Sequence, residues 1–157
     1  MRGGTTIITT IIGGIAGAVV AGKIAGKEVQ NKGEKLNKFK GYYNMLNHWL
    51  ALKQEGKSLT EYFVTNGYKE LAIYGMGEMG NRLYDELKGT EIQVKYAIDK
   101  NVASTYSELD VKEIDDEFPE VDVLVVTATF VFDEIKEELS KNVNMPIVSL
   151  EDVVYSV

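Results

Sequence analysis

Residues 71–89, LAIYGMGEMGNRLYDELKG, constrain the fold more than any other part of the chain. The first four of these residues are apolar and predict a short strand. Glycines follow at positions 75, 77 and 80 in the spacing G-x-G-x-x-G, and residues 78–88 then have the apolar period of a helix. A strand, a glycine turn and a helix in this order predict the first unit of a parallel α/β sheet.

The rest of the chain continues this alternation of strands and helices. We expect strands at 92–98, 110–114, 121–126 and 146–149, and helices at 131–141 and 151–155. The stretch 121–126, VDVLVV, is nearly all branched aliphatic, as in a strand that is buried on both faces. Strands joined by right-handed crossovers predict a Rossmann-like parallel sheet of about four to five strands, in the order 3-2-1-4-5, with flanking helices.

The glycine turn predicts a nucleotide site at one edge of this sheet. Gly75 would allow the tight turn, Gly77 would let a pyrophosphate approach the backbone, and Gly80 would let helix and strand pack closely. Asp99, nineteen residues after Gly80, would bond ribose hydroxyls. The candidate cofactor-binding residues are Gly75, Met76, Gly77, Glu78, Met79, Gly80, Asp99, Lys100, Thr127 and Ala128.

The expected ligand is NAD or a nucleotide-sugar. The helix N-terminus would offer a positive end to an anion, and Asp99 would repel the 2′-phosphate of NADP, a preference that Lys100 weakens. Glu78 lies inside the turn and counts against tight pyrophosphate binding. The alternative interpretation is that the glycines serve only the turn and the packing, in a body that binds no nucleotide.

Composition excludes several other chemistries. The chain has no cysteine, which excludes disulfides, thiolate metal sites and cysteine nucleophiles, and its single histidine excludes a multi-histidine site within one chain. Residues 58–157 hold eight Lys and Arg against twenty-one Asp and Glu, a net charge of −13. A body this acidic argues against nucleic-acid binding. No catalytic group and no metal ligand is predicted.

The first residues of the chain predict a membrane anchor. Residues 3–22 carry no charge, and twenty helical residues span the hydrocarbon core of roughly 30 Å. Two alternatives stay open: a signal peptide cleaved near Ala16-Gly17-Ala18, and a soluble glycine-rich tail.

The charges on either side of this span predict its orientation. Residues 1–57 hold nine Lys and Arg against three Asp and Glu, a net charge of +6, and most of these lysines follow the span. The positive-inside rule then predicts a single pass through the inner, cytoplasmic membrane with the C-terminal domain in the cytoplasm.

Between span and body, residues 28–54 have the period of an amphipathic connecting helix. One apolar stripe, which we call the seam, has a/d spacing and consists of Val29, Leu36, Phe39, Tyr43, Leu46 and Leu50. A second stripe beside it consists of Tyr42, Met45, Trp49 and Leu52. We expect the later half of this helix to pack on the body, and the earlier half to be a stalk or a surface for a homo-oligomer or a partner enzyme. His48 falls clearly on neither stripe and is interpreted as a polar surface residue.

A break follows this helix, and the body begins. Ser58 and Glu61 have the spacing of a capping box, in which the Ser58 hydroxyl accepts from the Glu61 N–H and the Glu61 carboxylate bonds back. The predicted division is therefore an anchor with its basic flank at 1–27, the connecting helix at 28–57, and a Rossmann-like nucleotide-binding domain at 58–157.

Four stretches of the body, at 71–88, 94–101, 121–135 and 146–154, carry a resemblance to a known family. They resemble the small Rossmann-like nucleotide-binding domains of bacterial surface-polysaccharide biosynthesis proteins, which also occur fused to glycosyltransferases, acyltransferases and methyltransferases. The resemblance implies a dinucleotide or nucleotide-sugar pocket formed by Gly75, Gly77, Gly80 and Asp99. This chain has no transferase domain. The Tyr-x-x-x-Lys spacing of short-chain dehydrogenases and epimerases occurs at Tyr84 and Lys88, within the expected helix 78–88, and at Tyr96 and Lys100, at the expected strand 92–98.

Three functions are consistent with these patterns. The first is a membrane-tethered cytoplasmic module that binds a dinucleotide or nucleotide-sugar, is not an enzyme, and is associated with polysaccharide biosynthesis. The second is an interaction or scaffold protein, whose body binds no ligand and whose seam assembles it. The third and least favoured is an NAD-dependent sugar-nucleotide oxidoreductase or epimerase that works with a partner chain, since such an enzyme needs an acid/base group near the nicotinamide.

Overall fold

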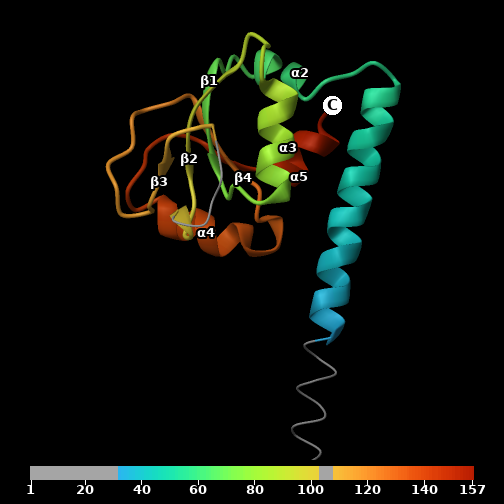
Figure 1. Cartoon of the computed structure of the whole chain (residues 1–157), viewed down its shortest axis with the longest axis horizontal. Coiled ribbons are helices and arrows are strands. Elements are labelled where there is room, and N and C mark those ends of the chain that lie inside the picture. The colour runs from blue at the N-terminus through green and yellow to red at the C-terminus, as the bar shows by residue number, and fades with distance from the viewer. Residues whose placement is uncertain (1–31, 103–107) are drawn as a thin grey trace, which may run out of the picture. The chain divides into compact units, whose positions relative to one another are not determined.

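A computed structural model describes residues 32–102 and 108–157 of the chain. The body is an α/β fold with one sheet of five parallel strands in the order β3-β2-β1-β4-β5, and Figure 1 shows β3, β2, β1 and β4 following one another in this order. The predicted fold class and strand order are therefore confirmed. The elements are α2 (Thr60–Thr65), β1 (Glu70–Tyr74), α3 (Glu78–Leu87), β2 (Gln93–Ile98), β3 (Val111–Lys112), β4 (Val123–Val126), η2 (Thr129–Val131), α4 (Phe132–Leu139), β5 (Ile147–Ser149) and α5 (Leu150–Tyr155).

The central strands are buried on both faces because helices cover each side. Every residue of β4 is buried, as its branched aliphatic sequence predicts. Alternate residues of β1 and β4, with β2 and β5, form a core with Ile135 and Leu139 of α4. The other residues of β1 and β4 point to the opposite face, since successive side chains alternate along a strand. The carboxyl ends of β1, β2 and β4 consequently meet at one edge of the sheet.

The chain divides into two compact units, residues Met1–Tyr43 and Asn44–Val157. One helix extends from residue 32 to residue 54, and its residues belong partly to the first unit and partly to the second. Within the second unit, three members of the second stripe are buried: Met45, Trp49 and Leu52. The expectation that the later half of the connecting helix packs on the body is therefore confirmed. His48 is half-buried and stacks on Tyr155, with their ring centroids 4.8 Å apart, so it is less exposed than expected.

A buried carboxylate fixes the start of the body. Glu86 of α3 accepts hydrogen bonds from the Ser58 hydroxyl at 3.0 Å and from the Leu59 N–H at 3.2 Å, and it pairs with Lys53 at 2.7 Å. Burial would raise the pKa of Glu86, but the bonds from Lys53, Ser58 and Leu59 outweigh that effect and lower it. One side chain thereby connects three helical segments of the second unit.

The capping box at Ser58 is only half formed. The Glu61 carboxylate accepts from the Ser58 N–H at 3.3 Å, as predicted. The Glu61 N–H, however, bonds the Ser58 carbonyl, and the Ser58 hydroxyl accepts instead from the Thr60 N–H. The prediction was wrong on this bond because the hydroxyl proton is directed to Glu86, a residue distant in sequence.

The predicted membrane span at 3–22 lies outside the described residues. Among the helices of 32–102 and 108–157, none is both long and apolar enough to cross a membrane.

Removing the Glu86 carboxylate tests whether this group holds the helices together. We expect Glu86→Gln to lower the free energy of unfolding of the full-length chain by about 2 kcal/mol at pH 7, because hydrogen bonds to a buried charged group are lost. Asp85→Asn is the matched control, since Asp85 makes only an exposed ion pair with Arg82; we expect a change under about 0.5 kcal/mol. Equal effects in urea denaturation would contradict this role of Glu86.

The lowered pKa of Glu86 also predicts that the stability difference between the parent and Glu86→Gln depends on pH. The folded-state pKa of Glu86 is lowered, so its contribution is complete above the unfolded value of about 4.3 and is lost as the pH falls through the folded-state pKa. The stability difference between the parent and Glu86→Gln should therefore shrink below about pH 4.

Candidate functional site

The glycine turn between β1 and α3 is a close contact of backbone with backbone. A Cβ atom at Gly80 would lie 2.1 Å from the Gly75 carbonyl oxygen, so no other residue fits there without a shift of the chain. Gly75 has a φ of +91°, in the left-handed region that favours glycine. The turn and packing roles predicted for these two glycines are therefore confirmed, and they hold whether or not a ligand binds.

Thr127, at the end of β4, fixes the turn from the other side. Its hydroxyl lies 2.7 Å from the Gly75 carbonyl oxygen and 3.1 Å from that of Tyr74, and the side chain is buried. A Cβ atom at Gly75 would lie 2.8 Å from this hydroxyl. Thr127 thus joins the carboxyl ends of the two central strands through hydrogen bonds to backbone carbonyls of Tyr74 and Gly75.

Asp99, directly after β2, is tied to the same turn. One carboxylate oxygen accepts from the Met76 N–H at 2.8 Å, and the other accepts from the Asn101 N–H at 2.8 Å. Its position at the tip of the second strand is the predicted one. Its bond to Met76 was not predicted, and it means that one backbone N–H of the turn already donates to a carboxylate.

A pocket of about 420 Å³ lies at this edge of the sheet. Four predicted residues line it: Gly75, Asp99, Lys100 and Ala128. The other five lining residues were not predicted: Tyr74 of β1, then Val131, Glu134, Ile135 and Glu138 of η2 and α4. The volume is within the range of sites for small molecules.

The other six predicted residues do not line the pocket: Met76 and Gly77 belong to the turn, Glu78, Met79 and Gly80 begin α3, and Thr127 follows β4. Met76 is buried, and Gly77 and Glu78 are exposed. A Cβ atom at Gly77 would meet nothing within 4 Å, so the backbone there faces open space. The turn and the pocket are therefore neighbouring but distinct surfaces.

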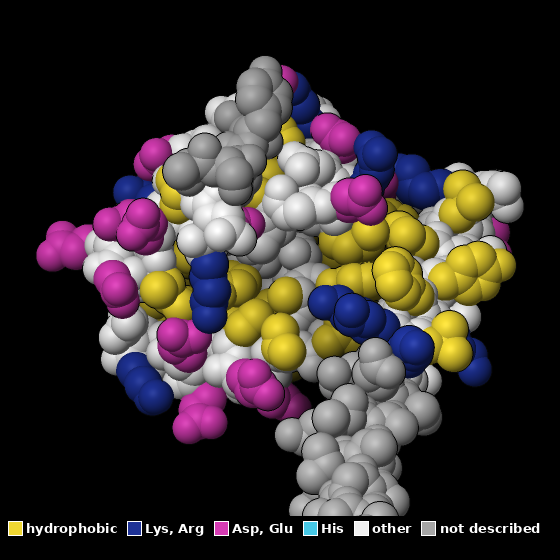
Figure 2. Space-filling model, turned by 60° about the horizontal axis from the view of Figure 1, so that its bottom comes forward, with side chains coloured by type: hydrophobic (Ala, Val, Ile, Leu, Met, Phe, Trp, Pro, Cys, Tyr) yellow, Lys and Arg dark blue, Asp and Glu magenta, His cyan; other side chains and the backbone are white. Residues whose placement is uncertain are grey.

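The charges around the pocket are mainly negative. Asp99, Glu134 and Glu138 contribute carboxylates, and Lys100 contributes the one ammonium of the lining, 3.6 Å from Glu138. Figure 2 brings the α4 side of the molecule forward and shows acidic side chains among hydrophobic ones there. Apolar and carboxylate surfaces together suit an uncharged, hydroxyl-bearing group better than a phosphate.

No metal centre is formed by the residues that the structure describes. Within 32–102 and 108–157, no three His, Cys, Asp or Glu side chains are arranged to hold an ion. The acidic run at Asp115, Asp116 and Glu117 lies at a separate surface hollow with Asn142 and Asn144.

Comparison of the chain with protein-family models, with curated proteins and with solved structures found no match. The candidate site therefore rests on the geometry of this chain alone.

Gly80 and Gly77 give a matched test of the close contact. We expect Gly80→Ala to destabilise the full-length chain by about 3 kcal/mol, because the new methyl group overlaps a backbone carbonyl. Gly77→Ala should cost no more than about 1 kcal/mol, since Gly77 has a φ of −71° and open space around it. Thermal unfolding of both variants measures the difference, and similar costs would contradict the contact.

Proposed function

We propose that this chain is a Rossmann-like module that binds a dinucleotide or a nucleotide-sugar and leaves catalysis to other proteins. The observation that carries the proposal is the pocket at the carboxyl ends of β1, β2 and β4, with Asp99 and Ala128 in its lining. In sheets of this order, ligands bind in the crevice where the strand order reverses, which here is between β1 and β4.

The glycine turn supplies a place for the phosphates of such a ligand. The N-terminus of α3, a helix of ten residues, presents backbone N–H groups and the positive end of its dipole. Gly77 leaves the approach to this end open. Glu78 in the first turn reduces the attraction for an anion, which favours a moderate affinity in the micromolar range or weaker.

The proposed setting follows from the first residues of the chain. A span at 3–22, followed by lysines, would tether the body to the cytoplasmic face of the inner membrane. The family resemblance suggests polysaccharide or glycan biosynthesis as the pathway. The least supported alternative is an NAD-dependent sugar-nucleotide oxidoreductase or epimerase whose acid/base group comes from a partner chain.

Ligand binding is tested on the full-length chain with NAD, NADP and UDP-glucose. We expect NAD or UDP-glucose at ten times the dissociation constant to raise the melting temperature by about 4 °C, and NADP to have less effect because of Asp99. Gly77→Ala should fold and yet lose most of this shift, because its methyl group occupies the open approach to the turn. The proposal fails if none of the three, at millimolar concentration, changes the melting temperature.

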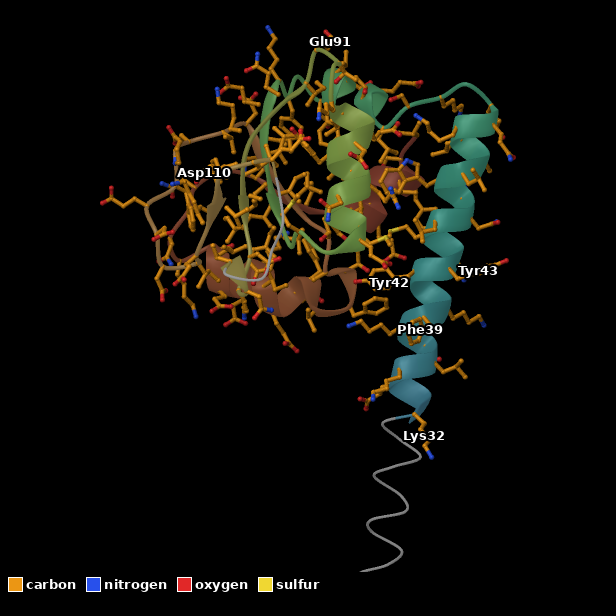
Figure 3. The ribbon with its side chains drawn as sticks, viewed as in Figure 1. Lys32, Phe39, Tyr42, Tyr43, Glu91 and Asp110 are labelled. Carbon is orange, nitrogen blue, oxygen red and sulfur yellow. The ribbon has the colours of Figure 1, made fainter. Side chains whose placement is uncertain are left out.

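A second candidate function, a scaffold, is favoured by the exposed residues of the seam; its first member, Val29, lies outside the described residues. Leu36, Phe39 and Tyr43 are exposed to 68%, 73% and 69%, and Leu50 is exposed to 56%. Figure 3 shows Tyr42 and Tyr43, from the two stripes, leaving different sides of the helix. Large apolar side chains at a/d spacing are typical of a helix that pairs with another helix.

The scaffold is tested by light scattering of the full-length chain in a mild detergent. If the seam assembles the protein, the parent should have the mass of at least a dimer, and Leu36→Ser with Phe39→Ser should give the monomer mass. Val64→Ser is the control, because Val64 is also exposed, to 49%, but lies outside the seam. A parent of monomer mass would contradict self-association.

A further inference from the structure

One buried hydroxyl in the body lacks a hydrogen bond of good geometry. Tyr74, the last residue of β1, is only 4% exposed, and its hydroxyl is the one buried side-chain polar atom among residues 32–102 and 108–157 without a well-formed hydrogen bond; the polar group beside it is the Lys100 ammonium. Tyr96 of the neighbouring strand β2 is equally buried, but its hydroxyl donates to the Pro119 carbonyl at 2.9 Å. A buried polar group that lacks a partner lowers stability, so its retention calls for an explanation.

The surroundings of this hydroxyl are those of the pocket. Tyr74 lines the pocket, and the charged groups that act on the pKa of its hydroxyl, namely Lys100, Glu138 and Asp99, line it as well. Burial raises that pKa, and this exceeds the opposing effects of Lys100, whose ammonium lowers the pKa through its charge and through a hydrogen bond with the hydroxyl. The hydroxyl is therefore protonated at neutral pH and can donate a hydrogen bond.

The pocket lining decides which kind of acceptor fits. Glu134 and Glu138 add negative charge, and Lys100 is already paired with Glu138. A phosphate at this place would meet carboxylates, and the N–H groups at the start of α3 lie outside the lining. Val131 and Ile135 supply apolar surface against which a flat ring can pack.

Access to the hydroxyl requires only that two surface side chains move. The side chains of Lys100 and Glu138 are exposed to 61% and 49%, and the ion pair between them is long, at 3.6 Å. Exposed ion pairs of this kind contribute little to stability. A ligand can therefore displace this pair without disturbing the core.

We propose that Tyr74 is a ligand-binding residue whose hydroxyl donates a hydrogen bond to an uncharged acceptor, a ring nitrogen or a carbonyl or sugar oxygen, of the ribonucleoside portion of the ligand. The phosphates then remain outside the pocket, at the turn. This inference rests on the proposed function, since it specifies which part of a nucleotide enters the pocket. It makes Tyr74, which precedes the G-x-G-x-x-G spacing, a determinant of specificity.

The experiment compares Tyr74→Phe with Tyr96→Phe in the full-length chain, using adenosine, uridine, NAD and UDP-glucose as probes. Tyr74→Phe removes a hydroxyl without a well-formed hydrogen bond, so the melting temperature of the free protein should be unchanged or higher. Its affinity for the probes, measured by calorimetry, should fall about tenfold. Tyr96→Phe removes a satisfied hydroxyl and should lower the melting temperature while leaving the affinity unchanged.

The outcomes separate this inference from the proposed function. A parent that binds none of the four probes contradicts both. If the parent and Tyr74→Phe bind the probes with equal affinity, the role of Tyr74 is overturned and the proposed function stands. A melting temperature of Tyr74→Phe that falls as far as that of Tyr96→Phe also overturns it, because the hydroxyl would then have a structural partner. Binding of NAD or UDP-glucose without binding of adenosine or uridine overturns the assignment of the ribonucleoside portion.

Discussion

The missing side chain of Gly80 is the constraint on which the rest of the body depends. Only a hydrogen atom fits against the Gly75 carbonyl, and this lets α3 begin directly beside the end of β1. The same carbonyl accepts a hydrogen bond from the hydroxyl of Thr127, directly after β4, and the N–H of Met76 donates to Asp99 at the tip of β2. The carboxyl ends of three strands are thus hydrogen-bonded to or continuous with one turn, and the pocket lies where these ends meet.

Most of the fold was predictable because its signals are local. The branched aliphatic run of β4, the apolar period of α3 and the glycine turn between β1 and α3 fix the element types, and right-handed crossovers then fix the strand order. The capping of α2 was not predictable in full, because the Ser58 hydroxyl bonds Glu86 across 28 residues of sequence. Nothing local to Ser58 distinguishes a hydroxyl that caps a helix from one that bonds a distant carboxylate.

The candidate site was predictable in position but not in composition. Glycine spacing and an acid at the end of the second strand located the turn and Asp99. The α4 side of the pocket was missed, since Glu134 and Glu138 look like ordinary charged positions on an amphipathic helix and only the packing of Ile135 turns them toward the edge of the sheet. Tyr74 was interpreted as a strand residue, and its sequence context does not distinguish a satisfied hydroxyl from an unsatisfied one.

The charges at this edge of the sheet determine the orientation in which a nucleotide would bind. The net charge of −13 on residues 58–157 disfavours anions, whereas the backbone N–H groups at the start of α3 attract them. The pocket beside them is bordered by carboxylates and apolar side chains. A ligand with one anionic and one neutral half can satisfy both surfaces in only one orientation, with its phosphates at Gly77 and its neutral half against Tyr74. The acidic lining would therefore orient such a ligand, since it makes the reverse placement unfavourable.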